Sequence, residues 1–165
     1  MSNWRDQFED ESVLRATTAL FDRYYHYIAL ALLVAFAFWN RTSSWGNYVV
    51  GGEILFRGND PWYHYRSTQY VVESFPSTMA TDPWTGFPEG AVQGQFGTIF
   101  DQLMALVALA IGLGSPSDEL VRMVVLFSPA VVGALVAIPT YLIGRRIGGR
   151  FAGVVGVAIL AFAAD

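Results

Sequence analysis

The stretch RGNDPWYHYRSTQY, residues 57–70, brings an acid, a histidine, two arginines and several aromatic rings together in an otherwise apolar chain. Asp60 could hold a hard divalent cation, because carboxylate oxygens are the ligands that Mg2+ and Mn2+ prefer. Near a metal or an anion, His64 could be a ligand or a donor. Arg57 and Arg66 could equally meet lipid phosphate, acidic side chains or a substrate group. This stretch is the first candidate for a functional site.

Asp60 and His64 also have purely structural interpretations. Asp is a preferred N-cap and proline is tolerated at the first helical position, so the sequence predicts a helix that begins at Asp60 and ends before Pro76. The local pattern favours such a cap, although one carboxylate oxygen can cap while the other binds a metal. His64 lies on the same side of that helix as Asp60. A simple aromatic cluster with its tyrosine neighbours explains it as well as a ligand role does.

A second DPW occurs at residues 82–84 and is followed by TGFPEGAVQGQFG. The glycines and Pro88 exclude a helix here, so we predict that Asp82 is a turn former and not a metal ligand. Trp84, like Trp45, suits a loop residue at the level of lipid headgroups.

The elements that must position these residues come as apolar blocks, which indicate a bilayer. We predict membrane spans at 24–39, 120–144 and 151–165; the uncharged part of the second is long enough, at ~1.5 Å per residue, to cross ~30 Å of hydrocarbon. His26 is expected to snorkel from the first span to the interface. The third block runs to Asp165, the last residue of the sequence, and we expect the chain to continue beyond it.

The arginines of the connection GRRIGGR set the expected topology. The positive-inside tendency places residues 145–150 in the cytoplasm. If the apolar run 99–114, which contains Asp101 and Gln102, also crossed, these arginines would lie outside, so we predict that this run does not span. An N-terminal cytoplasmic or interfacial helix at 1–23 and one large extracellular loop at 40–119 follow.

Composition excludes several classes of protein. The chain has no cysteine, so a disulfide framework or a thiolate metal site is excluded. Its 14 acidic residues exceed its 10 basic ones, all arginine, which argues against a nucleic-acid partner and suits a salt-loving host. No charged side chain follows Arg122 in the second predicted span, and residues 151–164 of the third carry none, unlike a typical channel or pump. Pro129 and Pro139 predict kinks, and Gly153 and Gly156 predict close helix packing.

Four segments, GNDPWYHYRSTQY, DPWTGFPEG, QFGTIFDQL and AIPTYLIGRRIGGRFAG, together resemble the N-terminal part of the catalytic subunit of archaeal oligosaccharyltransferase. The similarity extends from about Trp39 onward, and DPWYHYR is its specific element. It implies an all-α integral membrane protein of the cell membrane. The expected fold is a polytopic helical bundle of the GT-C type with a large extracellular loop after the first span.

The resemblance also implies roles for single residues. Asp60 resembles the family aspartate that helps to bind a divalent cation, Mn2+ or Mg2+, and contacts the acceptor amide, so it is the expected catalytic and metal residue. The family motif often has two acids, and the first of those places is Gly58 here. His64, Arg66 and Gln95 are further candidates for substrate binding; many archaeal relatives have a histidine at the place of Gln95.

The implied partners are a lipid-linked oligosaccharide on dolichyl phosphate or pyrophosphate, and an acceptor polypeptide with an N-x-[ST] sequon. One aspartate cannot fill the roughly six coordination positions of a hard cation, so residues 1–165 alone are expected to be inactive. Two alternatives stay open. One is another membrane glycosyltransferase that uses lipid-linked sugars, such as a protein mannosyltransferase, and the other is a polytopic transporter or scaffold with a structural outer loop.

Overall fold

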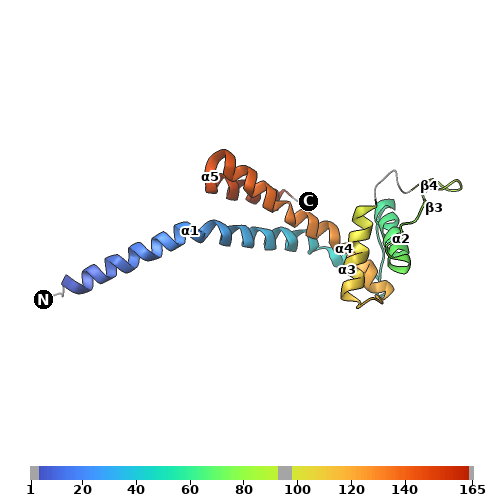
Figure 1. Cartoon of the computed structure of the whole chain (residues 1–165), viewed down its shortest axis with the longest axis horizontal. Coiled ribbons are helices and arrows are strands. Elements are labelled where there is room, and N and C mark those ends of the chain that lie inside the picture. The colour runs from blue at the N-terminus through green and yellow to red at the C-terminus, as the bar shows by residue number, and fades with distance from the viewer. Residues whose placement is uncertain (1–3, 93–97, 164–165) are drawn as a thin grey trace. The chain divides into compact units, whose positions relative to one another are not determined.

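The computed structural model describes residues 4–92 and 98–163, and within this part the chain is mostly helical (Figure 1). It divides into two compact units. Unit 1 combines the chain up to Arg41 with the chain from Val132 onward, and unit 2 comprises Thr42–Val131. Two segments, Val13–Tyr48 and Asp118–Phe162, are long and apolar enough to cross a membrane. The predicted helical membrane protein is thus supported in outline.

Unit 1 is built from α1 (Trp4–Thr42), the end of α4 (Asp118–Leu135) and α5 (Ala137–Phe162). The predicted N-terminal helix at 1–23 and the predicted first span at 24–39 lie on one continuous helix, without a break between them. This continuity has a simple reason, because the described part of α1 contains neither glycine nor proline.

The predicted span 120–144 is shared between α4 and α5, which meet at Val136. Val136 keeps helical angles, φ −58° and ψ −21°, and its N–H donates to the carbonyl oxygen of Val132 at 3.1 Å. The N–H of Thr140 then donates to the carbonyl oxygen of Val136 at 3.1 Å. The backbone therefore continues in helical form past the junction, where Pro139 supplies no donor.

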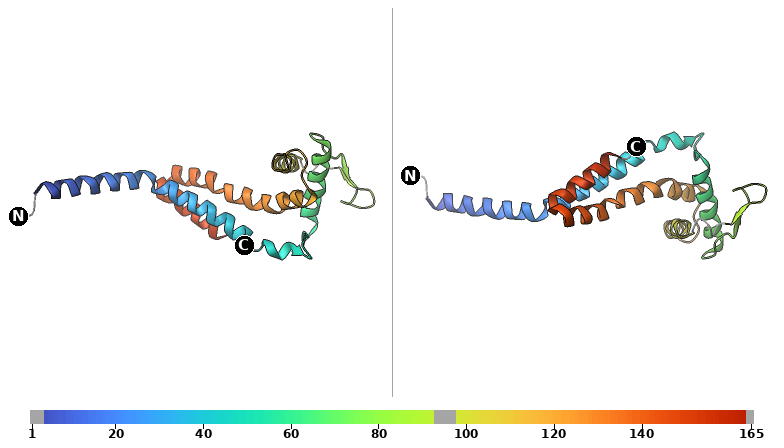
Figure 2. Two further views of the ribbon diagram at one scale, coloured as in Figure 1. Left: turned by 90° about the horizontal axis from the view of Figure 1, so that it is seen from below. Right: turned by 90° about the horizontal axis from the view of Figure 1, so that it is seen from above.

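α5 reverses direction at Gly148 and Gly149, so that two helical arms run side by side (Figure 2). Gly149 has φ 80°, which favours glycine because other residues are strained there. The arms are in close contact: a Cβ at Gly153 would lie 2.8 Å from the Tyr141 ring, and one at Gly144 would lie 2.9 Å from Gly153 Cα. The close packing predicted for Gly153 is thus confirmed.

Contacts between α1 and the two arms of α5 show which ends of these helices lie together in unit 1. Ala37 packs with Ala134 and Ala161, close to the ends at which unit 2 is attached. At the other end, Nη1 of Arg150 donates to the carbonyl oxygen of Asp22 at 3.0 Å. The turn at residues 145–150, called the arginine turn below, therefore lies at the end of unit 1 opposite to Arg41 and Val132, where unit 2 is attached.

His26 lies inside unit 1, and the prediction that it snorkels to the interface is wrong. Its side chain is buried and stacks on the ring of Tyr141, with centroids 6.0 Å apart and planes inclined by 9°. Among the described residues, His26 Nδ1 and the Tyr141 hydroxyl have no hydrogen-bond partner. The sequence could not predict this burial, because it depends on the returning arms of α5.

Unit 2 contains α2 (Asn59–Ser74), α3 (Ile99–Ile111), the first part of α4, the short 3-10 helix η1 (Trp45–Tyr48) and four strands. The strands form two antiparallel hairpins: β1 (Val49–Val50) with β2 (Glu53–Ile54), and β3 (Thr81–Asp82) with β4 (Ala91–Val92). The predicted all-α class is therefore corrected to mostly helical. In the first hairpin Gly51 and Gly52 both have positive φ, as a tight two-residue turn requires.

The core of unit 2 is apolar and draws on α2, α3 and α4 together with β2; its buried members are Ile54, Phe56, Tyr65, Met104, Ala108, Val121 and Val125. α3 lies beside α2 (Figure 1). With 13 residues it is ~20 Å long, shorter than the ~30 Å of a hydrocarbon layer. This length agrees with the prediction that the apolar run 99–114 does not span.

A polar network also joins α2 to the start of α4. The Tyr65 hydroxyl donates to Asp118, and Nε of Arg122 donates to the other oxygen of that carboxylate at 2.8 Å. The Arg122 guanidinium also lies 4.5 Å from the Tyr65 ring centroid and donates to the carbonyl oxygen of Ile54 at 3.2 Å. Burial, and then the bond to Asp118, raise the pKa of Tyr65 to about 12, so its hydroxyl stays a neutral donor.

Candidate functional site

The site begins at the first turn of α2, where the predicted cap is wrong. α2 starts at Asn59, and its N-cap is Gly58, with φ 83° and ψ 173°. Because glycine has no Cβ, the chain can turn into the helix before it reaches Asp60. The Asp60 carboxylate is left in the first turn, 90% exposed and with no capping hydrogen bond. The predicted end of the helix is confirmed, since Phe75 is the C-cap before Pro76.

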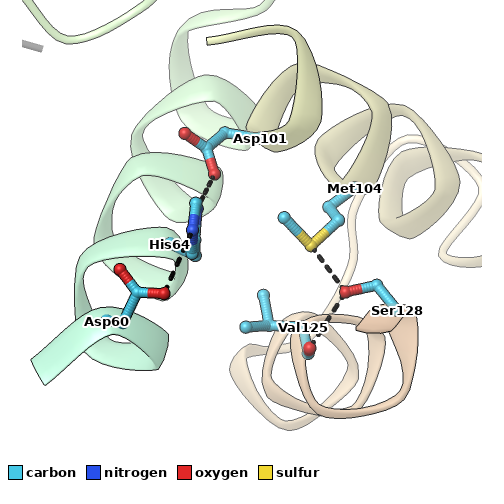
Figure 3. Close-up of polar contacts among 6 residues, drawn as sticks. All are labelled: Asp60, His64, Asp101, Met104, Val125 and Ser128. Atoms are coloured by element: carbon cyan, nitrogen blue, oxygen red, sulfur yellow. Dashed lines mark hydrogen bonds and ion pairs between the residues drawn. The ribbon is translucent and has the colours of Figure 1, made fainter. Parts of the chain in front are cut away.

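Asp60, His64 and Asp101 form a row along α2 and α3, with the histidine in the middle (Figure 3). His64 Nε2 lies 3.9 Å from Asp60 Oδ2, which confirms that the two side chains share one face of α2. On the other side, His64 Nδ1 lies 2.7 Å from Asp101 Oδ1. Asp101 is 1% exposed, and its second oxygen has no partner among the described residues.

The hydrogen bond to Asp101 fixes the orientation of the His64 ring. A carboxylate can only accept here, so Nδ1 carries the proton, and Nε2 is left to accept or, in the imidazolium, to donate. The bond to Asp101 raises the pKa of His64, against the opposing effect of burial. Tyr63 and Phe100 also pack edge-on against the ring, at 5.2 Å and 5.1 Å. The aromatic setting considered for His64 is thus confirmed, whereas its role as a ligand or donor stays a prediction.

A pocket of about 320 Å3 opens beside this row and is lined by Asn59, Asp60, Tyr63, His64 and Thr85. The exposed Asp60 carboxylate is thus available to a ligand. Among the described residues there is no group of three or more His, Asp or Glu side chains that could hold a metal ion. Asp60 can therefore supply part of a cation site, but these residues do not complete one.

Asp82 is a turn former, as predicted, and also an anchor between segments. It is 1% exposed and accepts from Arg66 Nε at 3.1 Å and Nη2 at 2.5 Å. The Trp84 N–H and the Thr85 hydroxyl bind the same carboxylate at 3.2 Å and 2.5 Å. Burial alone would raise the pKa of Asp82, but these hydrogen bonds outweigh it and hold the pKa below its ordinary value. Arg66 is therefore engaged by an acid, one of the partners considered for it.

A further candidate, Arg57, does not line this pocket. Gln95 lies outside the described residues, so its substrate-binding role stays a prediction. Arg57 donates to the carbonyl oxygen of Asn47 at 3.1 Å and lies over the Tyr48 ring, which is a local structural role. The sequence analysis missed Asp101 as a partner of His64. An acid inside an apolar helix was the available signal, because such an acid needs a polar partner.

Comparisons with known proteins identify the relatives of this chain. Residues 24–164 match the family model described as oligosaccharyl transferase STT3, N-terminal. The chain is 50% identical over 137 residues to the dolichyl-monophosphooligosaccharide–protein glycotransferase AglB of Haloferax volcanii, covering 83% of this chain and 13% of that protein. It is 29% identical over 141 residues to the dolichyl-phosphooligosaccharide-protein glycotransferase 3 of Archaeoglobus fulgidus, covering 86% of this chain and 16% of that protein.

Solved structures show the same similarity. The crystal structure of the Archaeoglobus fulgidus oligosaccharyltransferase in the apo form matches with a TM-score of 0.73 and 29% identity, over 86% of this chain and 16% of that one. The archaeal oligosaccharyltransferase AglB from the same organism, in complex with an inhibitory peptide and a dolichol-phosphate, matches over the same shares with a TM-score of 0.73 and 30% identity. The chain thus spans a small part of each relative's length.

Proposed function

The chain belongs to the oligosaccharyl transferase STT3 family, and from this premise we propose that it is the N-terminal part of a membrane glycosyltransferase. The enzyme would transfer a glycan from a dolichyl phosphate or pyrophosphate carrier to the asparagine of N-x-[ST] sequons. The supporting observation is the Asp60 carboxylate, which is 90% exposed at a pocket and makes no capping bond. Because the N-cap is Gly58, the Asp60 carboxylate is not used in capping and its oxygens are open to a ligand.

The reaction explains why a free carboxylate is needed at this place. An amide nitrogen is a poor nucleophile, because its lone pair is delocalised into the carbonyl. A carboxylate that accepts from the amide N–H groups of the acceptor can hold the nitrogen toward the first carbon of the sugar. Asp60 is the residue that we assign to this contact. His64, oriented by Asp101, presents Nε2 on the same side and can donate to an anionic group of the donor.

The proposed cofactor is a divalent metal, Mn2+ or Mg2+, which when bound would offset the negative charge of the departing phosphate. Asp60 is the ligand that the described residues offer, because its oxygens are exposed and a hard cation prefers carboxylates. Since such an ion takes about six ligands, the others must come from parts of the enzyme outside these residues.

We also propose a multi-pass topology with the Asp60 loop on the extracellular side. In unit 1 the arginine turn lies beside Asp22, whereas unit 2 is attached near Ala37. The helical path from Asp22 to Arg41 measures ~29 Å at ~1.5 Å per residue, close to the thickness of a hydrocarbon layer. With the arginines cytoplasmic, both ends of unit 2 would emerge on the outer face.

The proposal is tested with Asp60→Ala in the complete enzyme, assayed for glycosylation of an acceptor peptide in the presence of Mn2+. We expect turnover to fall by about 10^2- to 10^3-fold, the scale on which one lost electrostatic contact in the transition state acts. Glu89→Ala is the matched control, because Glu89 is an exposed acid on the same unit and does not line the pocket. Equal turnover in wild type and Asp60→Ala would remove Asp60 from the mechanism.

A further inference from the structure

A second pocket, of about 340 Å3, adjoins the Asp60 pocket. Its lining comes from α2 and from the turn after β3, and consists of Asn59, Trp62, Arg66, Trp84, Thr85 and Gly86. Asn59 and Thr85 line both pockets. The two pockets are therefore neighbours on α2, with Asn59 and Thr85 between the Asp60 carboxylate and the Trp84 side chain.

The lining of this second pocket combines aromatic rings with planar polar groups. Two indoles, a guanidinium, an amide and a hydroxyl face one space. Trp84 is 68% exposed, so its indole is accessible to a ligand. A sugar ring has an apolar C–H face that stacks on an indole, and a rim of hydroxyls that bonds to amide and guanidinium groups.

The walls of the pocket are held in place before any ligand arrives. Asp82 binds Arg66 of α2 and both Trp84 and Thr85 of the turn, so the two sides are tied by one buried carboxylate. Arg66 uses two of its five N–H donors in this contact, and three are left for a ligand. Trp62 is fixed from behind, since its Nε1–H donates to the carbonyl oxygen of Phe56 at 3.1 Å. Such preorganisation lowers the entropy cost of binding.

We propose that this pocket is a carbohydrate subsite that holds a sugar of the lipid-linked donor, with the Trp84 indole as the stacking surface and Arg66 as a hydroxyl-binding donor. The inference rests on the proposed function, which requires the phosphate-linked sugar to lie next to Asp60. It adds a location for that sugar. It also gives the β3–β4 hairpin, for which the sequence predicted only a turn, a role in donor specificity.

An exposed tryptophan is also typical of a membrane anchor. The neighbours of Trp84 decide between a sugar-stacking role and an anchoring role. Phe87 stacks on Trp84 with centroids 6.5 Å apart and is exposed as well, so this pair could rest on headgroups. A headgroup anchor, however, needs no ordered polar wall, whereas Trp84 shares its pocket with Arg66, Asn59 and Thr85. The lining therefore favours a sugar over a lipid surface.

The test uses the complete enzyme in lipid nanodiscs, with dolichyl phosphate that carries one hexose as donor, and sugar-free dolichyl phosphate as a binding probe. Trp84→Ala should raise the KM for the donor about tenfold, while kcat stays within about twofold, because stacking holds the sugar equally before and during transfer. Binding of sugar-free dolichyl phosphate should not change. Trp84→Phe keeps an aromatic face and should recover most of the loss.

Trp45→Ala is the matched control, since Trp45 is 44% exposed on the same unit and does not line this pocket. It should leave both measurements at the wild-type values. An unchanged KM in Trp84→Ala would overturn the subsite. The subsite would also be overturned if Trp84→Ala weakened the binding of the glycosylated and the sugar-free carrier equally. A similar rise in KM in Trp45→Ala would overturn it too, because it would indicate that the tryptophans anchor the enzyme in the membrane. If wild-type enzyme transfers no sugar from a phosphate or pyrophosphate donor, the proposed function itself fails.

Discussion

Replacing Asp82 by alanine tests whether one carboxylate holds the β3–β4 hairpin on α2. The change removes four hydrogen bonds, two from Arg66 and one each from the Trp84 N–H and the Thr85 hydroxyl. Arg66 is 25% exposed, so its guanidinium would be left partly buried without its acid. Within residues 4–92, the hairpin pairs only Thr81 with Val92 and Asp82 with Ala91, which is too little to hold it alone.

The expected magnitude follows from these contacts. Removing one partner of a buried ion pair costs about 3–5 kcal/mol, and water that reaches the partly exposed Arg66 places the value near about 3 kcal/mol. At about 1.4 kcal/mol per factor of ten, the population of the open hairpin should rise about 100-fold. Asp60→Ala removes an exposed carboxylate instead, and should cost less than about 0.5 kcal/mol.

Amide hydrogen exchange across residues 81–92 of the complete enzyme measures this opening directly. In Asp82→Ala the exchange rates should rise about 100-fold in this segment, with little change in α1 or α5. The same contact is pH-dependent: the folded pKa of Asp82 is depressed, so its stabilisation is present above its ordinary pKa of about 4 and is lost as pH falls through the lower folded pKa. Protection within about threefold of wild type in Asp82→Ala would refute this account.

Two further predictions concern packing in each unit. Gly153→Ala should lower the melting temperature of the enzyme by several degrees, because its Cβ would meet the Tyr141 ring and carbonyl at 2.8 Å, whereas Gly156→Ala meets only a methyl group at 3.5 Å and should be tolerated; equal melting temperatures would contradict the close approach. Tyr65→Phe should destabilise the start of α4 by about 1–2 kcal/mol in hydrogen exchange, because Asp118 loses a donor, while Tyr70→Phe should have no effect; unchanged protection in Tyr65→Phe would show that the bond contributes little.

Local rules predicted those features of the sequence that depend on neighbours along the chain. The apolar blocks predicted helices, DPW followed by glycines predicted a turn at Asp82, and GRRIGGR predicted the reversal that occurs at Gly148 and Gly149. Pro76 correctly marked the end of α2. The turn at Asp82 and the end at Pro76 depend on the backbone preferences of aspartate, glycine and proline, whereas the helices and the connection between them follow from apolar length and arginine placement.

These local rules could not predict contacts between residues that are far apart in the sequence. Asp101 lies far from His64 in sequence, and the two meet only because α3 packs on α2. The capping prediction failed for a subtler reason: Gly58 and Asp60 both suit a helix start, and glycine at φ 83° allows the earlier turn. The catalytic and metal roles of Asp60 stay predictions, since the described residues offer only part of the expected cation site.

The attachment of unit 2 at a single end of unit 1 has an evolutionary consequence. Both connections, after Arg41 and before Val132, leave from the same end as the Ala37, Ala134 and Ala161 contact. Insertions and deletions between them would therefore leave the helices of unit 1 and its arginine turn unchanged. In the proposed topology, residues 42–131 could then be exchanged as one cassette without altering the membrane crossings.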